Sequence, residues 1–180
     1  SLLVASLALA GCGTRGDSGD DASGSGSSEN KVAKIGVIAP LSGDLAALGL
    51  GIKNSVDLAI KQANDSKAIP GWTLELAAED DEAKPDVGKN AATKLAADKD
   101  VVGVVGTLNS SVAQSVQPVL ASAKITMVSP ANTNPSLTQG ADFATAPART
   151  YPNYFRTCTT DSIQGPFAAR YLFEKAGIKE

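Results

Sequence analysis

Short apolar runs alternate with segments of helical periodicity from Val32 onward, and this alternation constrains the fold more than any other feature. Each run suits a strand buried on both faces, and each periodic segment is long enough to cover it. The predicted strands are 34–40, 72–78, 101–105, 125–129 and 154–157, and the predicted helices are 48–64, 85–98, 110–123 and 163–176. This order predicts right-handed βαβ units and an α/β fold, a parallel sheet with helices on both faces.

Two clusters of small polar residues follow predicted strands at the point where each strand ends. Val101–Ser111 reads VVGVVGTLNSS, and Ile125–Pro135 reads ITMVSPANTNP. A third loop, 40–44, follows the first strand. Ligands of open parallel sheets bind beyond the carboxyl ends of the strands. The sequence therefore predicts a binding site where these loops meet.

The residue types in these clusters allow two interpretations. Ser110 and its neighbours stand at the start of a predicted helix, where they can cap it or help its N–H groups to hold a small anion. Pro130 and Pro135 stiffen the second loop, and Thr133 supplies a hydroxyl. Such a loop can hold a zwitterion through donors and a carbonyl, or it can be an ordinary surface turn.

The acidic run Glu79-Asp80-Asp81-Glu82 also has two interpretations. Paired carboxylates can carry out acid/base catalysis. Acidic residues can instead cap the helix predicted to begin near Pro85, and we favour this second interpretation because no other catalytic group accompanies the run.

The composition argues against several functional classes. A chain with no histidine cannot build Ser-His or Cys-His nucleophile pairs or histidine metal sites. Two cysteines lack the spacing of a zinc site, and a net charge of −3 without a basic cluster argues against nucleic acid as a partner. We expect neither an enzyme nor a cofactor or metal.

The first thirty residues are predicted to lie outside the folded part. Ser1–Gly11 is apolar and suits the core of a secretory signal, and the run that ends at Cys12 resembles a bacterial lipobox. Residues 1–12 are therefore interpreted as a signal remnant with Cys12 as the lipidated residue, although a chance cysteine would look the same. Residues 13–30 are rich in Gly and Ser and are predicted to form a flexible linker.

Five motifs in order resemble one family: KIGVIAPLSGDLAALG, AAEDDEAKP, VVGTLNSS, MVSPANTNPSLT and YFRTCTTDSIQGPFAARYL. Together they resemble the branched-chain amino-acid binding proteins among the type I periplasmic binding proteins, the receptors of ABC importers. The resemblance covers Val32 to about Lys175. It implies capture of a small amino acid and delivery to an ABC permease, by a lipid-anchored protein at the outer face of the cell membrane.

The resemblance also implies site residues. Ser110 matches a serine that binds the ligand carboxylate, Ala131 a residue whose carbonyl accepts from the ammonium, and Thr133 a threonine that contacts both groups. Asn109 and Asn132 adjoin these positions and are further candidates.

Two more candidates, Leu48 and Asp161, lie outside these loops. Leu48 stands where several relatives carry an aromatic over the ligand side chain, which leaves side-chain selectivity open. Asp161 lies near the expected crossing between lobes.

The resemblance implies a two-lobed protein. Residues 31–158 correspond to the N-terminal ligand-binding lobe, and residues 159–180 to the hinge crossing and the first helix of a second lobe that is truncated early. The face of that helix with Ile163, Phe167 and Tyr171 is expected to be exposed. The disulfide of some relatives is absent, because Ala83 and Asn109 stand at its positions, and Cys158 is expected to be an unpaired thiol.

Three alternatives stay open. The same fold serves binding proteins for amides, urea or aromatic acids, and it also serves as a sensor domain in signalling. A hydrolase that uses Ser110 is the third alternative, but the sequence shows no base to partner it.

Overall fold

The computed structural model describes residues 30–178, so the predicted signal segment, Cys12 and all of the linker except Asn30 lie outside the described residues. The chain folds as a parallel sheet with the strand order β2-β1-β3-β4-β5. The strands are β1 (Lys31–Ala39), β2 (Trp72–Asp80), β3 (Val101–Gly106), β4 (Thr126–Ser129) and β5 (Tyr154–Arg156). All five predicted strands are confirmed.

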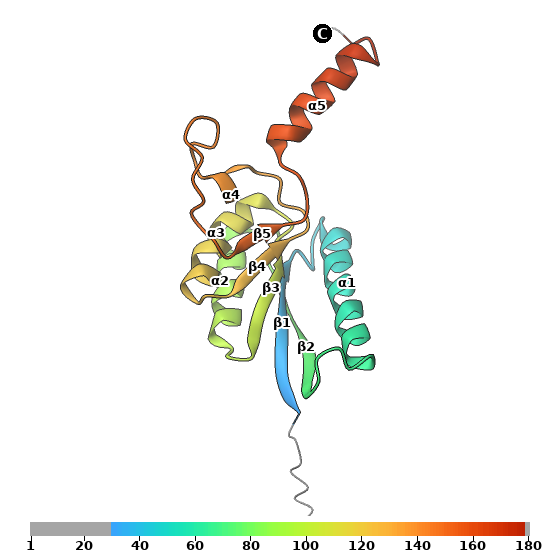
Figure 1. Ribbon diagram of the computed structural model, residues 1–180, viewed down its shortest axis with the longest axis vertical. Helices are drawn as coiled ribbons and strands as arrows, with labels where there is room; N and C mark the ends of the chain where they lie inside the picture. Colours follow the sequence, from blue (N-terminus) through green and yellow to red (C-terminus); the bar gives the residue numbers. More distant parts are fainter. Residues whose placement is uncertain (1–29, 179–180) are drawn as a thin grey trace, which may run out of the picture.

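Helices cover both faces of the sheet, as the alternation predicted. Figure 1 shows α1 (Ala46–Asp65) on one face and α2 (Pro85–Ala97) with α3 (Ser110–Ser122) on the other. The sequence did not predict α4 (Ser136–Gln139), because a single turn is too short to show a period. The last helix is α5 (Asp161–Glu174).

The core lies between the sheet and the pair α2 and α3. Val112, Val116 and Leu120 give α3 an apolar side with no exposed surface, and they pack with Ile38 of β1 in the same cluster. Gly88 lets α2 approach α3 closely, because a Cβ at this position would collide with Val112. The tight packing fixes where α3 begins, and α3 begins at one of the predicted binding loops.

The start of α1 is held against the loop after β1. A Cβ on Gly49 would overlap the backbone of Pro40, so glycine is required for this approach. This contact places the first turn of α1 at the carboxyl edge of the sheet, beside the loops that follow β3 and β4.

In contrast, α5 has no buried residue. Figure 1 shows it extending away from the sheet beyond the carboxyl edge. Ile163 is 64% exposed and Phe167 63%, which confirms the expected exposure of this face. Within residues 30–178, no helix combines the length and the hydropathy that crossing a membrane requires.

Candidate functional site

The loops after β3 and β4 meet at the carboxyl edge of the sheet, as the sequence predicted. The Ser129 hydroxyl donates to the carbonyl of Thr107 at 2.9 Å, and the Asn132 side-chain amide donates to the carbonyl of Leu108 at 2.9 Å. Both bonds are buried or partly buried, where a hydrogen bond is strongest. The two polar clusters therefore form one continuous surface.

The start of α3 has no side-chain cap, so the capping interpretation of this cluster is wrong. Asn109 occupies the cap position, but its side chain bonds to none of the first N–H groups. The Asn109 Oδ1 is buried and has no partner within the described residues. Ser110 makes one long contact, in which the Asn134 N–H donates to its hydroxyl at 3.4 Å. Uncapped N–H groups and a weakly engaged hydroxyl are groups that can donate to an anion, and an anion site at Ser110 stays a prediction.

The β4 loop presents free polar groups next to Ser110. Within the described part of the chain, the hydroxyl and N–H of Thr133 and the carbonyl of Ala131 form no hydrogen bond. Both residues are only partly buried. This loop thus offers two donors and one acceptor, the set that an α-amino acid needs.

Asn132 is a predicted ligand contact, but its side chain does not lie on the open surface of the site. Its side chain has no exposed surface. Its amide donates to Leu108, and its Oδ1 accepts from the Tyr154 hydroxyl at 3.1 Å. Burial raises the pKa of Tyr154 to about 12, so its hydroxyl remains a neutral donor. The contacts of Asn132 join the loops to each other and to β5.

Leu48 and Asp161 lie at the same edge. Leu48 is in the first turn of α1 and is 58% exposed, which leaves its side chain free. The N–H of Asp161 donates to the carbonyl of Thr133 at 3.0 Å, and this bond connects the start of α5 to the binding loop. Direct contact of either residue with a ligand stays a prediction.

The acidic run does not cap α2, so that expectation is wrong. No side chain caps this helix, whose cap residue is Lys84. Asp80 instead accepts from the N–H groups of Leu41 and Glu82, both at 2.8 Å. Burial raises the pKa of Asp80, but its hydrogen bonds outweigh this effect and the net pKa is lowered. Asp80 therefore fastens the loop after β1 to the end of β2.

Asp81 is the buried member of the acidic run. It has no exposed surface, and burial raises the pKa of its carboxyl group. One oxygen accepts from the Ala83 N–H at 2.8 Å, while Oδ2 has no partner within residues 30–178. No catalytic partner group accompanies it in the structure that is described. The Cβ of Asp81 lies beside Gly88 of α2.

Cys158 is partly buried and is the only cysteine among the described residues, so its expected unpaired state stays a prediction. Its thiol donates to the carbonyl of Asn132 at 3.2 Å. The side chains of residues 30–178 form no group of three or more acidic, histidine or cysteine residues that could hold a metal ion.

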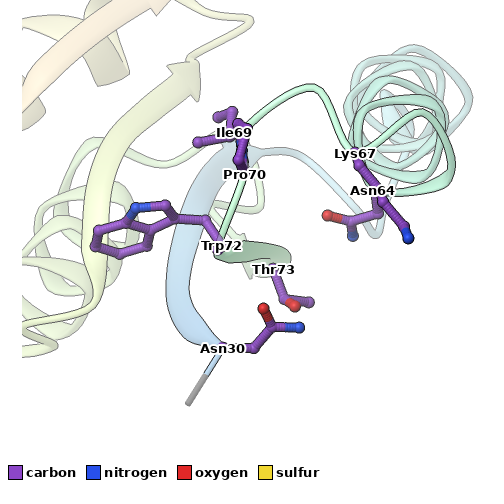
Figure 2. A pocket seen from close by; sticks show the side chains of 8 residues that line it. Asn30, Asn64, Lys67, Ile69, Pro70, Trp72 and Thr73 are labelled. Atoms are coloured by element: carbon purple, nitrogen blue, oxygen red, sulfur yellow. The ribbon is translucent and has the colours of Figure 1, made fainter. Parts of the chain in front are cut away.

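A cavity of about 470 Å³ lies at the opposite end of the sheet, near the start of β1 and β2. Figure 2 shows its lining, with Trp72 extending away from Asn64 and Lys67 of the α1 end. The Asn64 side chain is already bonded to both backbone groups of Leu74. The carboxyl edge is the better candidate because its free polar groups converge.

Sequence reasoning missed three residues that build the site from behind: Ser129, Tyr154 and Arg156. Each lies at a strand end, where a period-2 pattern predicts burial but not a hydrogen-bond partner. The charged residue Arg156 at the end of the predicted strand 154–157 is the signal that the sequence held.

Comparison with known proteins gives a consistent result. Residues 32–180 match the sequence profile of the periplasmic binding protein family. The Leu/Ile/Val-binding protein BraC3 of Rhizobium johnstonii is 37% identical over 140 residues, which are 78% of this chain and 35% of that protein.

Two solved structures share the fold. The substrate binding protein LivJ from Streptococcus pneumoniae, in complex with isoleucine, has a TM-score of 0.72 and 26% identity over 82% of this chain and 39% of its own. A solute binding protein from Rhodopseudomonas palustris, in complex with 3,4-dihydroxybenzoic acid, has a TM-score of 0.62 and 27% identity over 77% of this chain and 36% of its own.

The chain spans little more than a third of the length of these proteins. Its own part of the match is nevertheless continuous and includes the sheet and both binding loops. The chain therefore belongs to the periplasmic binding protein family.

Proposed function

We propose that the protein binds a small amino acid, most simply a branched-chain one, outside the cytoplasm and delivers it to an ABC permease. One observation carries the proposal: the free groups of Thr133, Ala131 and the uncapped start of α3 lie on one surface formed by two joined loops. The Leu/Ile/Val-binding relatives support the ligand class.

The carboxylate of the ligand lies between Ser110 and Thr133 in this proposal. The first-turn N–H groups of α3 and the two hydroxyls donate to it, and the positive end of the helix favours its charge. The Ala131 carbonyl accepts from the ammonium group. Leu48, exposed at the same edge, supplies apolar contact to the ligand side chain.

The remaining parts of the protein follow from this assignment. Residues 31–158 are the N-terminal lobe of the binding protein, and residues 159–180 lead through the hinge into a second lobe. Asp161 lies at that crossing. A lipid on Cys12 anchors the protein to the outer face of the membrane, and residues 13–30 serve as the tether.

Calorimetric titration of the complete protein with leucine, isoleucine and valine tests the ligand class. Ser110→Ala and Thr133→Ala are each expected to weaken binding by roughly tenfold to 150-fold, since each removes a hydrogen bond to a charged group. Ser111→Ala is the matched control, because this neighbouring serine has no assigned contact. Equal affinity of all variants and wild type would remove Ser110 and Thr133 from the site.

Membrane attachment is tested separately. With its natural signal present, Cys12→Ser is expected to move the protein from the membrane fraction to the soluble fraction, since stable anchoring depends on the acyl chains. Retention of the variant in the membrane fraction would contradict the anchor without affecting the ligand site.

Aromatic acids are the second candidate ligands. The Rhodopseudomonas palustris structure holds 3,4-dihydroxybenzoic acid in the same fold, and this ligand shares the carboxylate. It has no ammonium, so it leaves the Ala131 carbonyl without a partner. Preference for the benzoate over leucine in the same titration would favour this candidate.

A further inference from the structure

Of the side chains that hold the β4 loop from behind, Arg156 makes the most hydrogen bonds to the loop and to α4. The Nη1 of Arg156 donates to the carbonyls of Asn132 and Asn134 at 2.7 and 2.9 Å, and its Nη2 donates to the Thr138 hydroxyl at 2.7 Å. A single guanidinium group therefore contacts two carbonyls of the loop and one hydroxyl of α4, the helical turn that follows it.

These contacts involve the residues that alternate with the free ones. The carbonyls of Asn132 and Asn134 face Arg156, whereas the groups of Ala131 and Thr133 assigned to the ligand have no protein partner. A hydrogen bond from a charged donor is about twice as strong as one between neutral groups. Arg156 thus engages the carbonyls of Asn132 and Asn134, between which the groups of Thr133 stay open.

The effect of Arg156 reaches the other binding loop through Asn132. The carbonyl of Asn132 accepts from Arg156, and its side chain donates to Leu108 in the loop that leads into α3. The Tyr154 hydroxyl donates to the Oδ1 of Asn132, the other polar atom of that side chain. This chain of contacts runs from β5 through the β4 loop to the residues just before Ser110.

We propose that Arg156, acting through Asn132, is the positioning residue that fixes the spacing between Ser110 and Thr133 before a ligand arrives. The proposal rests on the proposed function, since it assigns a purpose to the spacing of the two ligand-binding loops. Arg156 does not contact the ligand in this scheme, because both of its terminal nitrogens are engaged by the protein and its Nε is buried.

Fork geometry distinguishes Arg156 from a simple positive charge. Two nitrogens of one rigid plane contact acceptors in the loop and in α4, and a lysine ammonium cannot reproduce that arrangement. Arg156→Lys and Arg156→Gln are therefore both expected to loosen the loop. Loss of this preorganisation is expected to weaken leucine binding by about tenfold, mainly because the loop must then be ordered on binding.

Arg149→Gln is the matched control. Arg149 also donates to backbone carbonyls, those of Pro152 and Tyr154, and stacks over Phe155, but it has no hydrogen bond to residues 130–135 in the described part of the chain. Its substitution is expected to lower the melting temperature without changing the affinity for leucine.

The experiment combines two measurements on the complete protein. Amide hydrogen exchange without ligand reports the order of residues 131–134, and calorimetric titration with leucine, isoleucine and valine reports affinity. Arg156→Gln and Arg156→Lys are expected to exchange faster in this segment and to weaken all three amino acids by a similar factor. Arg149→Gln is expected to match the wild type in both measurements.

Three results would overturn the proposal: wild-type exchange in both Arg156 variants, weaker binding with unchanged exchange, or full affinity in Arg156→Lys. If the wild type binds none of the amino acids, the proposed function fails, while the exchange data still decide whether Arg156 orders the loop. If the Arg156 variants do not fold, Thr138→Val removes one partner of Arg156, and it must show a smaller acceleration in residues 131–134 for the proposal to stand.

Discussion

The helices α3 and α5 are alike in length and in having an internal proline, but they differ completely in burial. They have 13 and 14 residues, and each contains an internal proline, Pro118 or Pro166. Five residues of α3 are buried, whereas α5 buries none. Apolar spacing therefore indicates which side of a helix is suited for burial, and only a neighbouring surface makes that side a core.

The largest test of this comparison is truncation of one leucine in each helix. Leu120→Ala in α3 removes a side chain with no exposed surface, and it is expected to lower the free energy of unfolding by about 2–5 kcal/mol. Leu172→Ala in α5 truncates a side chain that is 45% exposed, and a change within about 0.5 kcal/mol is expected. Urea denaturation measures both, and similar losses would show that α5 is covered in solution.

A smaller contrast comes from adding a methyl group in place of removing one. Gly88→Ala puts a Cβ into Val112 where α2 meets α3, and overpacking of this kind costs about 1–3 kcal/mol. Gly165→Ala in α5 meets nothing within 4 Å, and it is expected to stabilise the helix by at most about 1 kcal/mol. Thermal melts of the two variants should shift in opposite directions. A tolerated Gly88→Ala would mean that α2 and α3 pack more loosely.

The smallest expected effect concerns the buried carboxyl group of Asp81. Because the folded-state pKa of Asp81 is raised, its contribution to stability is complete only below the ordinary pKa of 3.8 and declines as the pH rises through the folded value. Asp81→Asn keeps the acceptor for Ala83 and removes the charge. The variant is expected to be more stable than the wild type near neutral pH, with a difference that shrinks toward about pH 4.

Denaturation of Asp81→Asn and wild type across this pH range measures the difference. A wild type that gains stability relative to Asp81→Asn as the pH rises would contradict the raised pKa.

The sequence predicted the strands, the long helices and the edge at which the loops meet, because periodicity and strand ends are local features. It did not predict the bonding inside that edge. In the sequence, Asn132 cannot be told apart from an exposed loop asparagine. In the structure its side chain is buried and bonded to Leu108 and Tyr154. The prediction for the acidic run failed for the same reason, because Asp80 accepts a hydrogen bond from the N–H of Leu41, which lies 39 residues earlier in the chain. Partners so distant in the chain have no local pattern.

The contacts of Arg156 have a consequence for how such a protein changes over evolutionary time. Most contacts that hold the loop come from Asn132 and Arg156, whereas the groups assigned to recognition lie on Ser110, Ala131 and Thr133, of which Ser110 adds one long contact to the loop. A lineage can then exchange side chains on the open surface while the supporting residues persist. Solved structures similar to this chain hold isoleucine in one case and 3,4-dihydroxybenzoic acid in the other.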